Sequence, residues 1–210
     1  LNGASAGSGV AGLRLASTVN GGSIRGFVIN RFSTNGILLD GADNVVIAGN
    51  YIGTDFTGQL DRGNTEDGIQ LQAGATGNTI GGLTASDRNI ISGNNNAGLA
   101  IDDTATADNL IIGNYVGLAA DGITAIGNTH DGIHLVGATN NTIGGITTSA
   151  RNVIASNAIH GIGIDGASGT KVLGNYIGVA ANGSSVRGNL GDGIRLTNSV
   201  TGTVIGGTTT

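Results

Sequence analysis

The sequence contains no cysteine, proline, methionine or tryptophan, and only three phenylalanines and three tyrosines among its 210 residues. The absence of cysteine excludes disulfide bonds and thiol chemistry, and the absence of proline excludes a collagen-like helix. A hydrophobic core must therefore be built from isoleucine, leucine, valine and alanine. The nine basic residues are scattered and outnumbered by 14 acidic ones, so no nucleic-acid partner is expected. No segment approaches the roughly 18 consecutive apolar residues that a membrane span needs.

What the sequence does have is glycine and repetition. It contains 41 glycines, and several phrases recur at intervals of 61 to 64 residues. Such a period is typical of repeat architectures, in which each unit buries its hydrophobic face against its neighbours. The clearest copies are GNYIG at 49–53, GNYVG at 113–117 and GNYIG at 174–178, together with DGIQL at 67–71, DGIHL at 131–135 and DGIRL at 192–196.

A shorter period lies within the long one. Seven segments with a glycine-apolar-x-apolar pattern start at residues 12, 36, 68, 98, 132, 161 and 193. The alternation is that of a half-buried strand, and two further short β-branched segments follow most of these strands. Parallel strands without crossover helices must stack as coils. The sequence therefore predicts an all-β fold, a right-handed single-stranded parallel β-helix of about seven turns with three short strands per turn, as one domain over 1–210.

One corner of each predicted coil carries asparagine. Asparagine tolerates left-handed backbone conformations and can form hydrogen-bonded amide ladders along a stack. The positions that precede the third strand are Asn50, Asn89, Asn114, Asn152 and Asn175. With this ladder the chain resembles the pectate-lyase-like β-helix superfamily. Its GNYIGT, GNxxDGI and NTIGG phrases most closely resemble repeat modules of large secreted and surface proteins of bacteria. The resemblance implies a secreted or cell-surface location and says little about activity.

Candidate catalytic residues are few. The resemblance draws attention to a paired-aspartate segment and a His-Gly step, which pectin-degrading hydrolases on this fold also carry. The basic pair of those enzymes is missing, however, and adjacent strand residues point to opposite faces. The outward row of the first strands reads Arg14, Leu38, Gln70, Ala100, His134, Gly163 and Arg195. If the protein is an enzyme, the expected site residues are Asp102, Asp103, His134 and His160.

Metal ligands are equally sparse. One long loop carries four carboxylates that are weak candidates for Ca²⁺, although a solvated acidic loop is the preferred interpretation. The run His130, Asp131, His134 has the spacing of helical metal ligands. The repeat register places it across a turn and into a strand, so no metal site is expected there, and no cofactor motif is present. The four loop carboxylates are Asp55, Asp61, Glu66 and Asp67.

These observations favour a non-catalytic structural or adhesive β-helix segment of an extracellular or cell-surface bacterial protein. The alternative is a carbohydrate-active enzyme, namely a polysaccharide lyase, epimerase or glycoside hydrolase, that acts on an acidic polysaccharide. The expected partners are polysaccharides or cell-surface components. The chain is expected to be part of a longer protein, and end-to-end self-association is expected because uncapped coils expose strand edges. Convergence of the candidate catalytic residues in one groove would favour the enzyme.

Overall fold

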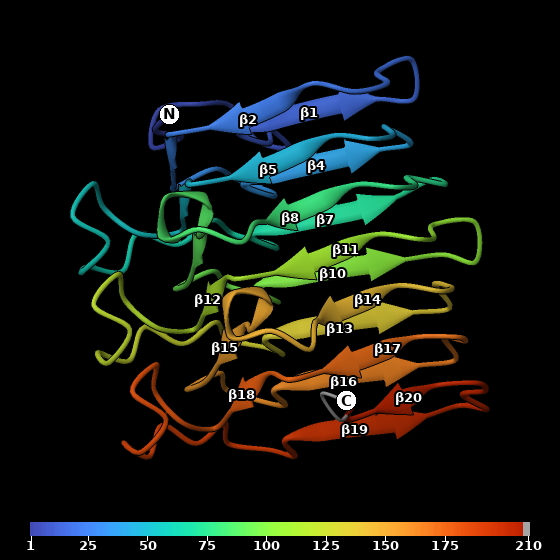
Figure 1. Cartoon of the computed structure of the whole chain (residues 1–210). Coiled ribbons are helices and arrows are strands. Elements are labelled where there is room, and N and C mark those ends of the chain that lie inside the picture. The colour runs from blue at the N-terminus through green and yellow to red at the C-terminus, as the bar shows by residue number, and fades with distance from the viewer. Residues whose placement is uncertain (208–210) are drawn as a thin grey trace.

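Three parallel sheets run the length of the molecule. The computed structural model describes residues 1–207, and in it the chain coils through seven turns (Figure 1). Every turn contributes one strand to each of the first two sheets, and six turns contribute a strand to the third. The prediction of a right-handed parallel β-helix with three short strands per turn is confirmed. The first sheet consists of β1 (Leu13–Ala16), β4 (Ile37–Asp40), β7 (Ile69–Gln72), β10 (Leu99–Asp102), β13 (Ile133–Val136), β16 (Ile162–Asp165) and β19 (Ile194–Thr197).

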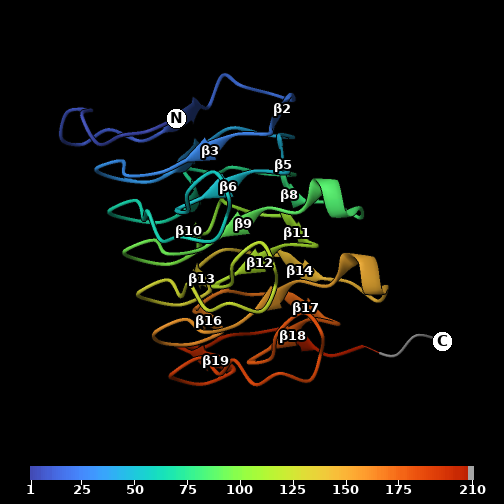
Figure 2. The same cartoon turned by 90° about the vertical axis from the view of Figure 1, so that its left-hand side faces the viewer.

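The other two sheets are built from shorter strands. The second consists of β2 (Ser23–Arg25), β5 (Val46–Ala48), β8 (Thr79–Gly81), β11 (Leu110–Ile112), β14 (Thr142–Gly144), β17 (Lys171–Leu173) and β20 (Val204–Ile205). The third consists of β3 (Val28–Ile29), β6 (Tyr51–Ile52), β9 (Ile90–Ile91), β12 (Tyr115–Val116), β15 (Val153–Ile154) and β18 (Tyr176–Ile177). Two single-turn 3₁₀ helices, η1 (Ala85–Asp87) and η2 (Thr148–Ala150), project beside the stack (Figure 2).

Period-two alternation places aliphatic residues in columns inside the coil. In the first sheet Leu71 pairs with Ile101, Ile101 with Leu135, and Leu135 with Ile164. All four are at most 1% exposed. Each such side chain contributes roughly 1.5–3 kcal/mol when it is removed from water. The opposite faces of the same strands point outward, and the residues on those faces are therefore available for function.

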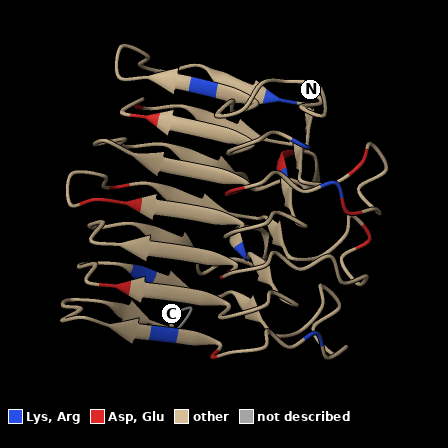
Figure 3. Cartoon of the chain, turned by 180° about the vertical axis from the view of Figure 1, so that it is seen from behind, with Lys and Arg blue, Asp and Glu red and all other residues tan. Residues whose placement is uncertain are grey.

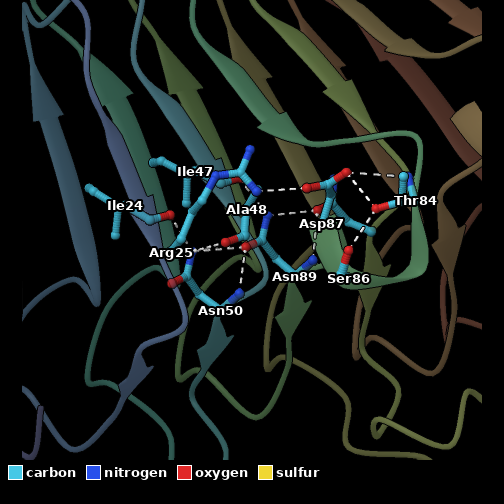
Figure 4. A network of polar contacts seen from close by, with 10 residues as sticks. Ile24, Arg25, Ile47, Ala48, Asn50, Thr84, Ser86, Asp87 and Asn89 are labelled. Atoms are coloured by element: carbon cyan, nitrogen blue, oxygen red, sulfur yellow. Dashed lines mark hydrogen bonds and ion pairs between the residues drawn. The ribbon is translucent and has the colours of Figure 1, made fainter.

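Asparagine amides join successive turns at a buried corner. Asn50 Nδ2 donates to Asn89 Oδ1 at 3.1 Å (Figure 4). Asn89 Nδ2 in turn donates to Asn114 Oδ1 at 2.9 Å. The ladder continues through Asn152 to Asn175. Each Oδ1 also accepts the backbone N–H of the asparagine in the preceding turn. One side-chain amide therefore forms hydrogen bonds with several buried polar groups. A further ladder, which the sequence reading missed, joins Asn64, Asn94, Asn128, Asn157 and Asn189.

Replacement of Asn114 by alanine is expected to lower the free energy of unfolding by about 2–4 kcal/mol, because several buried hydrogen-bonding groups lose their partners. Its Nδ2 donates to Ile80 O and Ile112 O, and its Oδ1 accepts from Asn89. Chemical denaturation measures the effect. Asn182→Ala is the matched control, because that exposed amide bonds only within its own loop. Equal losses in the two variants would contradict a stabilising role for the ladder.

Three long loops stack on one another at one side of the coil. They span 54–67, 118–131 and 179–192, and backbone hydrogen bonds join them, as from Ala120 N to Gly58 O and from Ala181 N to Gly122 O. Charged residues are sparse over the strands, and many lie at strand ends and in these loops (Figure 3). No helix among residues 1–207 has the length and apolar character needed to cross a membrane. The second loop ends at Asp131, directly before β13, and so contributes to the outer face of the first sheet.

Candidate functional site

Parallel register aligns three outward positions on neighbouring turns of the first sheet. His134 on β13 pairs with Gly163 on β16, and Gly163 pairs with Arg195 on β19. Neighbouring strands lie roughly 4.8 Å apart, so the two long side chains stand on either side of a residue that has none. The sheet therefore offers a gap between an imidazole and a guanidinium.

A second column lies just before these strands, at the residue that precedes the strand-initiating glycine. In several turns the side chain there accepts the backbone N–H of the next turn. Asp131 Oδ1 accepts from His160 N at 2.8 Å, and His160 Nδ1 accepts from Asp192 N at 2.9 Å. The same arrangement links Asp67 to Ala97 N two turns earlier. Asp131 and His160 thus stabilise the coil and line the cleft at the same time.

The hydrogen bond to His160 determines which of its ring nitrogens carries a proton. Because Nδ1 accepts the Asp192 N–H, the neutral ring is protonated on Nε2. Arg195 Nη1 lies 3.1 Å from that Nε2. Two donors cannot satisfy each other, so both can serve one acceptor in the cleft. A carboxylate has the geometry and the charge to accept from both groups.

These columns enclose a cleft of about 320 Å³ on the outer face of β13, β16 and β19. All three histidines of the chain line it, although they come from two different turns. Concave sites in which a few polar groups converge are the usual locations of ligand binding. The polar lining residues are His130, Asp131, His134, His160, Asp165, Arg195, Thr197 and Asn198.

The run His130, Asp131, His134 does lie across a turn and into a strand, but its side chains are not separated as expected. One nitrogen or oxygen from each residue lies within 4.8 Å of the others. The turn folds His130 back over the strand, and its ring centroid is 5.4 Å from that of His134. Asp131 is 2% exposed, and its Oδ2 lies 3.6 Å from His130 Nδ1.

Of the four expected catalytic residues, only His134 and His160 line the cleft. Asp102 lies on β10, where its Oδ2 accepts from Gln70 Nε2 at 2.7 Å. Asp103 occupies the following turn with a φ of 72° and accepts from the N–H groups of Ala105 and Thr106. Burial opposes ionisation of Asp103, but the hydrogen bonds it accepts outweigh burial and lower its pKa. The paired aspartates therefore serve the coil and do not converge with the histidines.

The four calcium candidates do not form a cluster of three or more ligands. Asp55 Oδ1 accepts from Gln59 N and Leu60 N within its own loop, and Asp61 Oδ1 accepts from Gly63 N. Within residues 1–207, the single cluster of three or more His, Asp or Glu side chains with metal-binding proximity is that of His130, Asp131 and His134.

Asp67 differs from the other loop carboxylates because it is only 5% exposed. Burial raises the pKa of Asp67 to about 7, an effect to which the nearby charges of Asp102 and Glu66 add. The backbone N–H of Ala97 opposes this rise only in part. Asp67 thus titrates close to neutral pH, whereas a solvated loop aspartate would be fully ionised there.

Sequence reading missed Asp131 and Arg195 as site residues, although both signals were present. The outward row placed Arg195 two turns after His134. The DGI phrase at 131–133 and the HGI phrase at 160–162 place Asp131 and His160 at the same point of successive turns. Reading that position as a column, rather than as isolated turn residues, would have brought Asp131 and His160 together.

Comparison with known proteins addresses the fold. No protein-family model matches the sequence, and no curated protein is significantly similar to it. Solved structures similar to this chain include two crystal structures of the periplasmic alginate epimerase AlgG, one of them a mutant, each with a TM-score of 0.51 and 17% identity. They cover 86% and 88% of this chain, which spans only 42% and 43% of the epimerase chains. The chain therefore shares the parallel β-helix fold of an alginate epimerase.

Proposed function

We propose that this chain is a carbohydrate-active β-helix that binds an acidic polysaccharide in the cleft. The observation that carries the proposal is the convergence of two donors, Arg195 Nη1 and His160 Nε2, 3.1 Å apart and without a shared acceptor. A uronate carboxylate supplies that acceptor and the compensating charge. The fold shared with an alginate epimerase supports this class of ligand.

The cleft also has the groups for proton abstraction next to a carboxylate. With a uronate carboxylate between Arg195 and His160, its sugar ring lies over Gly163, and His134 faces the ring from the other side. The two donors stabilise the negative charge that develops on the carboxylate as the neighbouring C–H proton moves to a His134 nitrogen. Delivery of a proton from a water molecule to the opposite face inverts the carbon. Alternatively, the C–O bond to the glycosidic oxygen breaks, that oxygen takes up a proton, and an unsaturated lyase product forms.

Hydrolysis is less well supported. A glycosidase needs two carboxyl groups at a fixed separation across the scissile bond. Asp102 and Asp103, the expected pair, form hydrogen bonds within the coil and do not line the cleft. The proposed reaction is therefore that of a lyase or an epimerase.

Incubation with alginate and polygalacturonate oligosaccharides in D₂O tests the proposal, with NMR detecting exchange of the proton next to the carboxylate. Exchange is expected for the wild-type protein. His134→Gln should abolish exchange while oligosaccharide binding persists. Arg195→Gln should weaken binding at least about tenfold, which corresponds to roughly 1.4 kcal/mol.

Arg14→Gln is the matched control for Arg195, because Arg14 occupies the same outward row six turns away and pairs with Asp40. It is expected to bind the oligosaccharides as the wild-type protein does. Equal binding by the Arg195 and wild-type proteins would overturn the assignment of the carboxylate site. Binding without exchange would leave a polysaccharide-binding protein and overturn the catalytic part.

A structural or adhesive role at the cell surface is the second candidate. It is favoured by the aliphatic columns and the amide ladders, which continue through successive turns and form a rod (Figure 1). Such a role places the chain outside the cytoplasm, as does an acidic polysaccharide ligand. Failure of every uronate oligosaccharide to bind would favour this second candidate.

A further inference from the structure

We propose that His130, Asp131 and His134 bind a divalent transition-metal ion, with Zn²⁺ as the fitting representative. The three side chains reach the same point from a loop end and the adjoining strand, and their nitrogen and oxygen atoms lie within 4.8 Å of one another. Two imidazoles with one carboxylate form a ligand set that zinc uses when a fourth position stays open.

Two observations support the inference. Asp131 is buried, and Oδ1 of its carboxylate accepts from His160 N, whereas Oδ2 lies 3.6 Å from His130 Nδ1. His130 Nδ1 is itself buried and has no hydrogen-bond partner. A buried carboxylate is costly without a counter-charge. A cation between these atoms satisfies both of them.

The geometry requires only side-chain movement. Ligand atoms around a tetrahedral zinc ion at about 2.0–2.2 Å lie roughly 3.3 Å apart, so separations that now reach as much as 4.8 Å must shorten by up to about 1.5 Å. The His130 side chain is 37% exposed, and His134 is half-buried at the edge of the cleft. Both rings can therefore turn towards the fixed Asp131 carboxylate, while the hydrogen bond to Asp131 Oδ1 keeps that carboxylate in place.

His160 does not join the triad. Its Nδ1 accepts the Asp192 N–H, and its Nε2 faces the Arg195 guanidinium. A permanently charged arginine disfavours a second cation at that nitrogen. The cleft thus has a metal-binding end at His130 and an anion-binding end at Arg195.

This inference goes beyond the proposed function and does not depend on it. A bound ion uses the lone pair of His134 that proton abstraction needs, so Zn²⁺ is expected to inhibit turnover if the protein is an enzyme. Metal binding is measured without saccharide, and saccharide binding is measured in the presence of a chelator. Failure of one proposal is therefore distinguishable from failure of the other.

Calorimetric titration of the metal-free chain with Zn²⁺ is expected to show one saturable site. The repeat supplies a substitution that the fold already accommodates, because Glu66 and Gln70 stand in the turn of β7 where His130 and His134 stand in the turn of β13. The variant H130E/H134Q should bind Zn²⁺ at least about 30-fold more weakly, with circular dichroism unchanged. Non-saturable wild-type binding, or equal affinity in the variant, would overturn the proposal.

The converse experiment transplants the triad. Asp67 occupies the place of Asp131, and Ala100 occupies the place of Gly163. The variant E66H/Q70H/A100G is therefore expected to raise the stoichiometry from one ion to two. A stoichiometry that stays at one in a folded variant would show that this arrangement of ligands does not bind the ion.

Discussion

Replacement of Gly163 by alanine is expected to weaken Zn²⁺ and uronate binding by at least about tenfold each. A Cβ atom there would lie 2.4 Å from Asp131 Oδ2 and 3.2 Å from His134 Cδ2. It would displace the carboxylate that anchors the metal triad and would occupy the floor of the saccharide site. A tenfold loss of affinity corresponds to roughly 1.4 kcal/mol of binding free energy.

The chain with this methyl group should still fold. Gly163 lies within β16 and has no positive φ, so its backbone conformation accommodates alanine. The expected loss of stability is about 1–2 kcal/mol, a usual cost of overpacking. Gly188→Ala is the matched control, because a Cβ there meets no atom within 4 Å. Calorimetric titration of both variants measures the effect, and unimpaired binding by the Gly163 variant would contradict the assigned cleft.

The free energy of unfolding should fall by about 2–3 kcal/mol between roughly pH 5 and pH 8, and Asp67→Asn should remove most of that fall. Burial raises the pKa of Asp67 to about 7 in the folded chain, whereas the unfolded value is the ordinary 3.8. The folded state therefore holds this proton more tightly than the unfolded state does. The stability that the Asp67 proton contributes to the folded state is fully present below about pH 4 and is lost as the pH rises through 7.

Denaturation at several pH values measures this effect. The asparagine variant retains an oxygen that can accept the Ala97 N–H, so it should match the wild type at acidic pH and exceed it at pH 8. Asp103→Asn provides a control of opposite sign, because the hydrogen bonds to Asp103 outweigh burial and lower its pKa. Its contribution is lost as the pH falls. A wild-type profile that does not decline towards pH 8 would contradict the buried state of Asp67.

The fold was predictable because its determinants are local and repeated. Alternation within the glycine-apolar-x-apolar segments defined the first sheet, and the spacing of the segments defined the turns. Asn50 and its successors stood out because each precedes a recognisable strand. The second ladder was overlooked, although Asn64, Asn94 and Asn128 all lie four residues before a strand-initiating glycine. The residues around these asparagines differ from turn to turn, so the alignment of the asparagines in successive turns became clear only from their hydrogen bonds.

The site was predictable only in part because it depends on contacts between turns. His134 and His160 both line the cleft, but Asp131 and Arg195, which contact His160, lie 29 and 35 residues from it in the sequence. Asp131 was interpreted as a turn residue, and it does hold the His160 N–H. Its other oxygen faces the histidines. The structural role of Asp131 can be predicted from a single repeat. Its second role, as part of the cleft, depends on residues of the neighbouring turns.

The column of side chains that accept N–H groups from the next turn has a consequence for how such a protein can change. The same hydrogen bond forms whether the acceptor is asparagine, aspartate or histidine, as at Asn35, Asp67, Asp131 and His160. Side chains of different charge and chemistry can therefore occupy one line of the rod. New binding functions can arise by exchange of single residues at intervals of about 4.8 Å, while the scaffold beneath them remains unaltered.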